Sequence, residues 1–497
     1  MKSVYLLIVL FFFLQTVNAQ TQGIAYTAVG KGVATTFVTD YHSLGINSSA
    51  LGWKPSVEGK KFTVGSTEFG AGIYSDSMNV DKLKKLYGAV RTQISNNDSE
   101  PANWQEQQQY AADYMRSGLT MFADYNWLGF SYQNEKFGGV AVNIRESYSW
   151  YSKLNEELTN ILFKGKLADY FDSLTVVFGA DTSVIANNPN YSQDTLDAVI
   201  LGTISTPLNL GQISRGSEVR LSWNRYYNFG YGRKIFGKDS LFVVYGGIGG
   251  RFIQSMAMFN MESRDDGFYM YSSITPNFDI DYGAIANFNP SNYSQSGAIP
   301  TVVGNGYGFD LSASALLFNK LKVAAAVNNI GQVTYKRNVY KVNDTLVGSL
   351  AVNGLSDYDV TQSVDEFLRD GGVFELLGVE QYTLKNAANL RLGASLDIGN
   401  IASVGIDVVA PFNSSNPGSL VNPVVSIGGE IRLVKFMAIS AGYFGGGIYK
   451  NNIPVGINFK LKEGMYEFGV SSYDALSFFM KESNSISAAF GFARFHF

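Results

Sequence analysis

The sequence has no cysteine and only two histidines, His42 and His496, among its 497 residues. The lack of cysteine excludes disulfide bonds, cysteine nucleophiles, cysteine-ligated zinc and iron–sulfur clusters. Two histidines near opposite ends of the chain cannot form a histidine-rich metal site. We expect both to be solvated or pore-facing imidazoles, and we predict neither a metal nor a cofactor.

Charge is also scarce. Charged residues make up 16% of the chain, whereas about 25% is usual for a soluble protein. Lysine and arginine (38) do not outnumber aspartate and glutamate (42), so a nucleic-acid partner is not expected. The chain is instead rich in glycine (52), tyrosine (30) and phenylalanine (35), with only 11 prolines. This composition excludes disorder and favours β-structure with wide apolar surfaces.

The N-terminus has the pattern of a secretory signal peptide, which we place at residues 1–19. Lys2 precedes an apolar run over residues 4–14, and small residues, Val17 and Ala19, stand at the expected cleavage site. The run is too short to span a bilayer as a helix, and no later stretch has eighteen uninterrupted apolar residues. An exported chain this apolar can then span a membrane only as a closed β-barrel. We predict a location in the outer membrane of a Gram-negative-type bacterium.

Polar and apolar side chains alternate along several segments, as in strands with one face toward lipid and the other toward a polar interior. The clearest case is residues 388–398, and residues 424–433 and 454–461 repeat it. Residues 218–229 follow the same alternation, with Arg225 interrupting the apolar face. On the polar faces of the C-terminal strands we expect lumen-facing charges at Arg391, Asp407, Glu430, Arg432, Lys460 and Glu467.

The connections between the predicted strands alternate in length. We expect strands near residues 60–74, 118–132, 137–149, 217–231, 239–258, 306–318, 321–340, 388–398, 401–411, 422–433, 436–446, 453–461, 465–472 and 485–497. Every second connection is short, and the others include long loops at 75–117, 150–216, 259–305 and 341–387. Short turns at one end and long loops at the other are typical of outer-membrane barrels. We therefore predict an all-β fold, a transmembrane antiparallel β-barrel of about 14 strands over residues 59–497, with helical extracellular loops.

Helical patterns occur inside the long loops, at residues 79–95, 103–117, 151–172 and 361–377. Long ordered loops usually have a role. Two interpretations stay open here: the helices cap the mouth of the barrel, or their apolar faces simply pack loop against loop.

The segment before the first strand carries a recognisable motif. A glycine-rich start, an aspartate and an Asn…Ala-Leu group occur at Gly30, Gly32, Asp40, Asn47, Ala50 and Leu51. This pattern resembles the N-terminal hatch of the FadL-like barrels, the long-chain fatty acid and hydrocarbon transporters, although Ser48 and Ser49 stand where that family has proline and alanine. The resemblance implies a fourteen-stranded barrel whose lumen is plugged by the N-terminal segment, here residues 20–58, with Asp40 and His42 in a polar interior.

The C-terminal part carries the same resemblance. Residues 388–409 and 425–446 resemble the strand–turn–strand and the following hairpin of the FadL-like superfamily. The terminal Phe497 on an alternating strand is similar to the signal read by the outer-membrane assembly machinery. The large insertions in the middle of the chain look more like the larger FadL-related barrels, which are similar to the PorV-like accessory barrels of type IX secretion.

Catalysis is not expected. The Gly-x-Ser-x-Gly motif does not occur, and neither histidine lies where it would serve a site facing the outer leaflet. Two functions remain. One is passage of a hydrophobic small molecule across the outer membrane through a plugged lumen. The other is a non-transporting accessory barrel that docks surface or secretion-machinery proteins. The expected partners are therefore outer-membrane lipid together with a hydrophobic small molecule or other outer-membrane or secretion proteins.

Overall fold

The computed structural model describes residues 25–79, 81–82, 85, 104–238, 241–265, 267–354, 374–447, 449–475 and 484–497. The predicted signal peptide at 1–19, and most of the helices predicted at 79–95 and 361–377, lie outside these residues. Within the described ranges, no helix has the length and apolar character needed to cross a bilayer.

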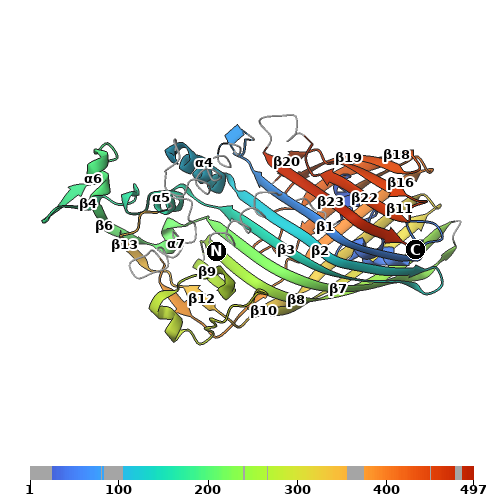
Figure 1. Cartoon of the computed structure of the whole chain (residues 1–497), viewed down its shortest axis with the longest axis horizontal. Helices are drawn as coiled ribbons and strands as arrows, with labels where there is room; N and C mark the ends of the chain where they lie inside the picture. Colours follow the sequence, from blue (N-terminus) through green and yellow to red (C-terminus); the bar gives the residue numbers. More distant parts are fainter. Residues whose placement is uncertain are drawn as a thin grey trace.

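A closed antiparallel barrel of fourteen strands forms the body of the molecule (Figure 1). Each strand pairs with the next around the ring, and the last pairs with the first over Thr63↔His496 to Tyr74↔Ser485. Alternating side chains explain why the sheet closes, since closure satisfies every backbone edge in an apolar surrounding. In ring order the strands are β1 (Phe62–Ser75), β2 (Leu119–Asn134), β3 (Gly138–Lys153), β7 (Glu218–Lys238), β8 (Phe242–Arg264), β10 (Gly304–Leu317), β11 (Leu321–Tyr335), β16 (Asn389–Ile398), β17 (Ala402–Pro411), β18 (Val424–Val434), β19 (Met437–Gly446), β21 (Val455–Leu461), β22 (Tyr466–Ser472) and β23 (Ser485–His496).

All fourteen predicted strands are confirmed, and so is the count. The turns at one end of the barrel are tight, as at residues 318–320 between β10 and β11, where Phe318 and Asn319 both have positive φ. Left-handed backbone at two successive positions is what a tight hairpin between right-twisted strands requires. The chain's C-terminus lies at this end, and the long loops gather at the other (Figure 1).

The outer face of the barrel is apolar and the inner face polar, in the predicted register. On β16 and β18, Leu392, Leu396, Val425 and Ile427 are exposed on the outside, whereas Arg391 is buried inside. Arg225 on β7 faces outward without breaking the register. Its Nη2 lies 3.0 Å from Oε2 of Glu146 on β3.

Two tryptophans complete this outward ion pair. The indole N–H groups of Trp127 and Trp223 donate to the Glu146 carboxylate, at 3.1 and 2.6 Å. Glu146 is 4% exposed and the Arg225 side chain 20%, so this ion pair on the outer wall is largely buried. A charged pair of this kind is tolerated on a membrane-facing surface because each charge has a partner and the aromatic rings shield both.

Further strands extend the wall at the loop end. β9 (Gly267–Ile274) pairs with β8 and with β12 (Val339–Val342), β12 pairs with β14 (Leu376–Gly378), β15 (Tyr382–Lys385) pairs with β11, and β20 (Tyr449–Asn452) pairs with β19. None of these strands was predicted as a separate element. β9, β14 and β15 lie in predicted long loops, β12 begins inside the predicted strand 321–340, and β20 lies in the shorter connection after the predicted strand 436–446.

The remaining loop residues form a small layer beyond the barrel (Figure 1). A second sheet has the order β13-β6-β4-β5, and helices lie beside it. The helices predicted within 103–117 and 151–172 are confirmed as α4 and α5. The elements are β4 (Ser173–Phe178), β5 (Asp181–Ala186), β6 (Val199–Asn209), β13 (Leu346–Leu350), α4 (Trp104–Ser117), α5 (Glu156–Lys164), η3 (Gly165–Leu167), α6 (Gln193–Asp197) and α7 (Leu210–Ile213), with short 3₁₀ turns η4 (Pro276–Phe278) and η5 (Gly283–Phe288) in the 259–305 loop.

The loop layer has a hydrophobic core of its own. Leu158 and Ile161 of α5 pack with Phe171, Leu210 and other side chains from three loops. The layer thus brings the 150–216 and 341–387 loops together, and it includes Met261 of the β8 end. Apolar packing between loops, one of the two interpretations left open above, is therefore what the structure contains at this point.

Candidate functional site: the barrel lumen

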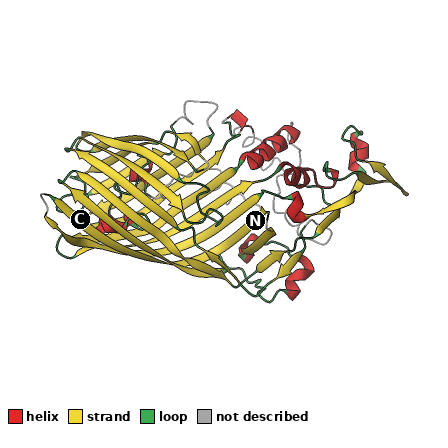
Figure 2. Cartoon of the chain, turned by 180° about the vertical axis from the view of Figure 1, so that it is seen from behind, coloured by secondary structure: helices red, strands yellow, loops and turns green. Residues whose placement is uncertain are grey.

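Residues 25–53, hereafter the lumenal segment, lie inside the barrel. They form α2 (Tyr26–Val29) and two 3₁₀ turns, η1 (Asp40–Ser43) and η2 (Ser48–Gly52), which Figure 2 shows among the short helices enclosed by the strands. Most of their side chains are buried. A fourteen-stranded barrel leaves a lumen too wide for wall side chains alone to fill, and this segment occupies part of it.

A buried network of charges fixes η1 to the wall. Arg494 of β23 forms ion pairs with Asp40 and with Glu467 of β22, and its Nη1 lies 3.1 Å from Glu467 Oε2. His496 Nε2 lies 2.9 Å from the same oxygen, Glu467 Oε2. Both carboxylates and the guanidinium are almost fully buried. Because a buried charge is stable only with partners, these contacts hold η1 in one position.

Glu68 of β1 is a second anchor for η1. Its Oε1 accepts from the hydroxyl of Tyr41 at 2.6 Å and lies 3.0 Å from His42 Nε2. Asn126 of β2 donates to its other oxygen at 2.7 Å. Gly129 lies under the Tyr41 ring, where any larger residue would overlap it. Neither histidine of the chain is solvated: both point into the lumen against a buried carboxylate.

Asp407 of β17 anchors the first half of the lumenal segment. Its Oδ2 accepts from the backbone N–H groups of Ala34 and Thr35, at 2.7 and 2.8 Å, and from the Thr35 hydroxyl at 2.9 Å. Nearby, Lys31 Nζ lies 2.9 Å from Oε2 of Glu430, which also pairs with Arg432. Two wall carboxylates therefore bind backbone and side chain of the segment directly.

Polar contacts hold η2 against β10 and β2. Asn47 caps η2, because its Oδ1 accepts from the N–H of Ser49 while its Nδ2 donates to the carbonyl of Thr35. The Ser49 hydroxyl donates to Ser314 of β10 at 2.7 Å. Gln133 of β2 donates to the carbonyls of Ala50 and Leu51, at 3.4 and 3.3 Å.

Glycines on the inner wall make room for the backbone of the lumenal segment. A Cβ atom at Gly428 or Gly442 would overlap the carbonyl oxygen of Lys31. A Cβ at Gly232 would overlap the carbonyl oxygen of Ser48 in the same way. Part of the high glycine content of the chain is thus explained by close approach between segment and wall.

We predict that Gly428→Val displaces the lumenal segment near Lys31. The valine side chain would meet the Lys31 carbonyl, and overpacking of this kind costs about 1–3 kcal/mol or more. The expected result is a lower thermal midpoint and tryptic cleavage after Lys31, which is buried in the intact barrel. Gly297→Val is the control, since its nearest neighbouring atom is 3.8 Å from the added Cβ. Equal behaviour of the two variants would contradict this account.

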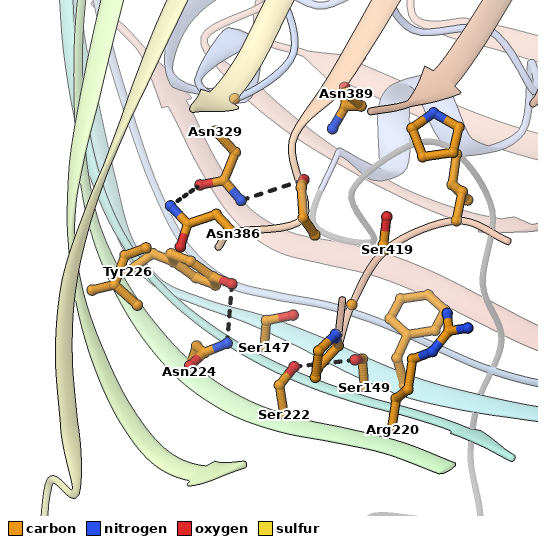
Figure 3. A pocket seen from close by; sticks show the side chains of 18 of the residues that line it. Ser147, Ser149, Arg220, Ser222, Asn224, Tyr226, Asn329, Asn386, Asn389 and Ser419 are labelled. Carbon is orange, nitrogen blue, oxygen red and sulfur yellow. Dashed lines mark hydrogen bonds between the residues drawn. The ribbon is translucent and has the colours of Figure 1, made fainter. Parts of the chain in front are cut away.

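A cavity of about 220 Å³ lies on the loop side of the lumenal segment. Side chains from β3, β7, β11 and β16 point into it from opposite walls, as Figure 3 shows for Ser149, Arg220, Asn224, Tyr226 and Asn389. Its lining is mixed: hydroxyl, amide and guanidinium groups lie beside aromatic and aliphatic side chains such as Phe122, Trp150 and Leu384. This composition suits a ligand that has both polar groups and an apolar surface.

A larger cavity of about 1540 Å³ lies on the side of the short turns. The lumenal segment contributes Thr27, Lys31 and Phe37 to its lining, and the wall contributes charges such as Lys322 and Asp397, whose nearest atoms are 3.0 Å apart. The segment thus borders both cavities, because Gly45 lines the first.

The structure places the motif residues and the charges that the sequence predicted for the lumen inside the barrel, whereas residues 20–24 of the predicted hatch lie outside the described residues. Gly30 approaches Gly456 of β21, Gly32 has a positive φ of 69°, and the contacts of the remaining motif residues are those given above. The predicted charges Arg391, Asp407, Glu430, Arg432, Lys460 and Glu467 all line the two cavities or touch the lumenal segment.

Sequence reasoning missed the anchors Glu68 and Arg494. Alternation alone could not have placed them with the inward glycines: Gly65 and Glu68 are three residues apart and share the inward face only because the strand is irregular at Thr67, which has positive φ. Sequence reasoning also did not predict that Arg145, Arg220 and Arg251 line the loop-side cavity, although the alternation over residues 218–229 places Arg220 on the polar face.

A family model matches residues 170–468, more than half of the chain, and its description is "Family of unknown function (DUF5723)". The chain belongs to the DUF5723 family. No curated protein matches its sequence.

Several solved structures are similar to this DUF5723 chain, at sequence identities of 10–11%. The Pseudomonas putida toluene transporter TodX is 11% identical, with a TM-score of 0.38 over 97% of this chain and 98% of that one. The Ralstonia pickettii toluene transporter TbuX is 11% identical, with a TM-score of 0.40 over 96% and 99%. A Pseudomonas aeruginosa FadL homologue is 10% identical, with a TM-score of 0.33 over 96% of each.

Proposed function

We propose that this chain is an outer-membrane channel whose lumen is closed by residues 25–53 and which passes a small molecule when that segment shifts. The observation that carries the proposal is the position of the lumenal segment between two cavities, one open toward the long loops and one toward the short turns. A closed barrel whose lumen is blocked between two cavities is suited to controlled passage of a solute. A barrel that only docks partners does not need a lumen divided in this way.

The outer surface supports the membrane location. Large apolar side chains are exposed around the ring, among them Phe229, Ile248, Phe309 and Ile427. An exposed apolar band on a closed barrel is stable only in lipid. This supports the outer membrane as the site of action.

The substrate is proposed from the lining. Passage of a hydrophobic small molecule is what the FadL-like resemblance implies, and such a molecule would have to cross the loop-side cavity. The serines, asparagines and arginines there would lose hydrogen bonds to water without gaining any from an apolar ligand. The lining therefore favours a substrate that carries polar groups.

Solute uptake by reconstituted protein tests the channel. In a liposome-swelling assay with the purified full chain, we expect slow, solute-selective swelling together with a low ionic conductance in planar bilayers. Swelling at the rate of protein-free liposomes for every solute tested, polar and apolar, would contradict the channel. Fast, unselective swelling would contradict the closed lumen.

An accessory, docking barrel is the second candidate, and the loop layer favours it. The sheet β13-β6-β4-β5 projects beyond the barrel on its own core, and its edge strand β5 is mostly exposed (Figure 1). Crosslinking in intact outer membranes followed by purification tests it. A stoichiometric partner captured through β5, together with no solute uptake, would replace the channel proposal.

A further inference from the structure

The loop-side cavity has an unusual excess of basic side chains. Five basic residues line it, and Asp124 is the only acidic residue among its lining residues within the described ranges. The basic residues come from β3, β7, β8, β15 and β16, so they converge from separate parts of the wall: Arg145, Arg220, Arg251, Lys385 and Arg391. Convergence of guanidinium groups on one cavity is typical of sites that bind carboxylate or a similar anion.

Two of the arginines are held in place by acids outside the cavity lining. Arg251 forms an ion pair with Asp310 of β10, and Arg220 forms one with Glu218 two residues away on β7. Each guanidinium has five N–H donors, and one carboxylate uses two at most in a fork geometry. The ion pairs therefore orient the arginines and leave donors for a ligand. The Nε groups of Arg220 and Arg251 have no hydrogen-bond partner among the described residues.

Arg145 is the arginine best placed for a ligand. It forms an ion pair with Asp124, whose Oδ1 lies 3.3 Å from Arg145 Nε without hydrogen-bond geometry. Its guanidinium lies over the ring of Tyr226, 5.2 Å from the centroid, which fixes its plane. A side chain that is preorganised in this way binds an anion without losing much conformational freedom.

Acceptors for hydroxyl groups lie around the arginines. The Oδ1 atoms of Asn224, Asn328 and Asn389 are buried and have no hydrogen-bond partner in the described part of the chain. Asn224 and Asn389 point into the cavity from opposite walls in Figure 3. Leaving such an acceptor without a partner costs about 1–3 kcal/mol, so a ligand that donates hydroxyl hydrogens is favoured over a purely apolar one.

We propose that the loop-side cavity binds a small sugar that carries a carboxylate, with the carboxylate on Arg145 and the hydroxyls on the asparagines. The cavity, at about 220 Å³, is below the roughly 300–1,000 Å³ of sites for drug-sized ligands, which limits the ligand to about one sugar ring. This inference rests on the proposed channel, whose substrate class it names.

Isothermal titration calorimetry with the full chain in lipid nanodiscs tests the proposal, with D-glucuronate, D-glucose and decanoate as probes. We expect glucuronate to bind at least roughly tenfold more tightly than glucose, because the carboxylate adds charge-assisted hydrogen bonds. We expect Arg145→Gln to remove this preference. Arg215→Gln, in an exposed loop ion pair with Asp265, is the matched control and should leave it unchanged.

Three results would overturn the inference: equal binding of glucose and glucuronate, tighter binding of decanoate than of glucuronate, and an unchanged glucuronate affinity in Arg145→Gln. A parallel uptake assay with radiolabelled glucuronate in liposomes separates this inference from the channel. Binding without uptake would contradict the channel and keep the site. Uptake of other solutes without glucuronate binding would contradict the site and keep the channel.

Discussion

Deletion of residues 25–53 is expected to convert a closed barrel into an open pore. The segment lies in the lumen between a cavity of about 220 Å³ and one of about 1540 Å³, so we expect its removal to join the two cavities. The inner wall around it carries charges and hydroxyls, which water would solvate once the segment is gone. We expect single-channel conductance to rise by roughly tenfold or more, as for barrels with a water-filled lumen.

Planar-bilayer recording checks this, with the heat-modifiable mobility of the barrel on gels as the test of folding. Deletion of the exposed hairpin residues 179–180, between β4 and β5 of the loop layer, is the control and should leave the conductance unchanged. A folded deletion variant that conducts no more than the intact chain would show that another part of the molecule closes the lumen.

Loss of the Arg494 guanidinium is expected to be the most damaging single substitution in the lumen. Arg494→Leu would leave the carboxylates of Asp40 and Glu467 buried without their shared partner. Removal of one member of a buried ion pair costs about 3–5 kcal/mol, because an uncompensated buried charge remains. We expect the lumenal segment to detach around η1 and the free energy of unfolding to fall by about this amount.

Urea unfolding in lipid vesicles measures the effect, with Arg432→Leu as the matched control. Arg432 also pairs with a lumenal carboxylate, Glu430, but its side chain is 38% exposed and Glu430 keeps Lys31 as a partner. The control should therefore lose little stability. In the Asp40→Asn/Arg494→Leu double variant, the loss should be smaller than the sum of the two single losses, since one buried charge no longer lacks a partner. Additive losses would contradict a shared network.

The barrel itself could be predicted from the sequence because two independent patterns agree. The alternation of polar and apolar residues places Leu392 and Ile427 outside and Arg391 inside. The alternation of short and long connections predicts that consecutive barrel strands are antiparallel neighbours around the ring. Arg225 shows the limit of alternation alone. Its outward position is explained only by Glu146 on β3 and Trp127 on β2, which become neighbours through strand pairing, together with Trp223 two residues away on β7.

The loops were less predictable. The sheet β13-β6-β4-β5 joins residues 173–209 to residues 346–350, and such distant pairing leaves no local signal. In the lumen, the motif residues could be placed but not their partners. Asp407 binds the backbone of Ala34 and Thr35 across more than 370 residues of sequence. The two histidines were expected to be solvated or pore-facing; they face the lumen, but their partners Glu68 and Glu467 were not predicted.

One crosslink tests most directly that residues 25–53 fill the lumen. The hydroxyls of Ser49 in the segment and Ser314 on β10 are 2.7 Å apart, and the native chain has no cysteine. In Ser49→Cys/Ser314→Cys, oxidation of isolated outer membranes should give a nearly complete intramolecular disulfide, seen as faster migration without reductant and as a linked peptide by mass spectrometry. Ser49→Cys/Ser183→Cys, with the second cysteine on the exposed β5, should stay reduced. Two free thiols in the first variant, both open to a membrane-impermeant maleimide, would contradict the account.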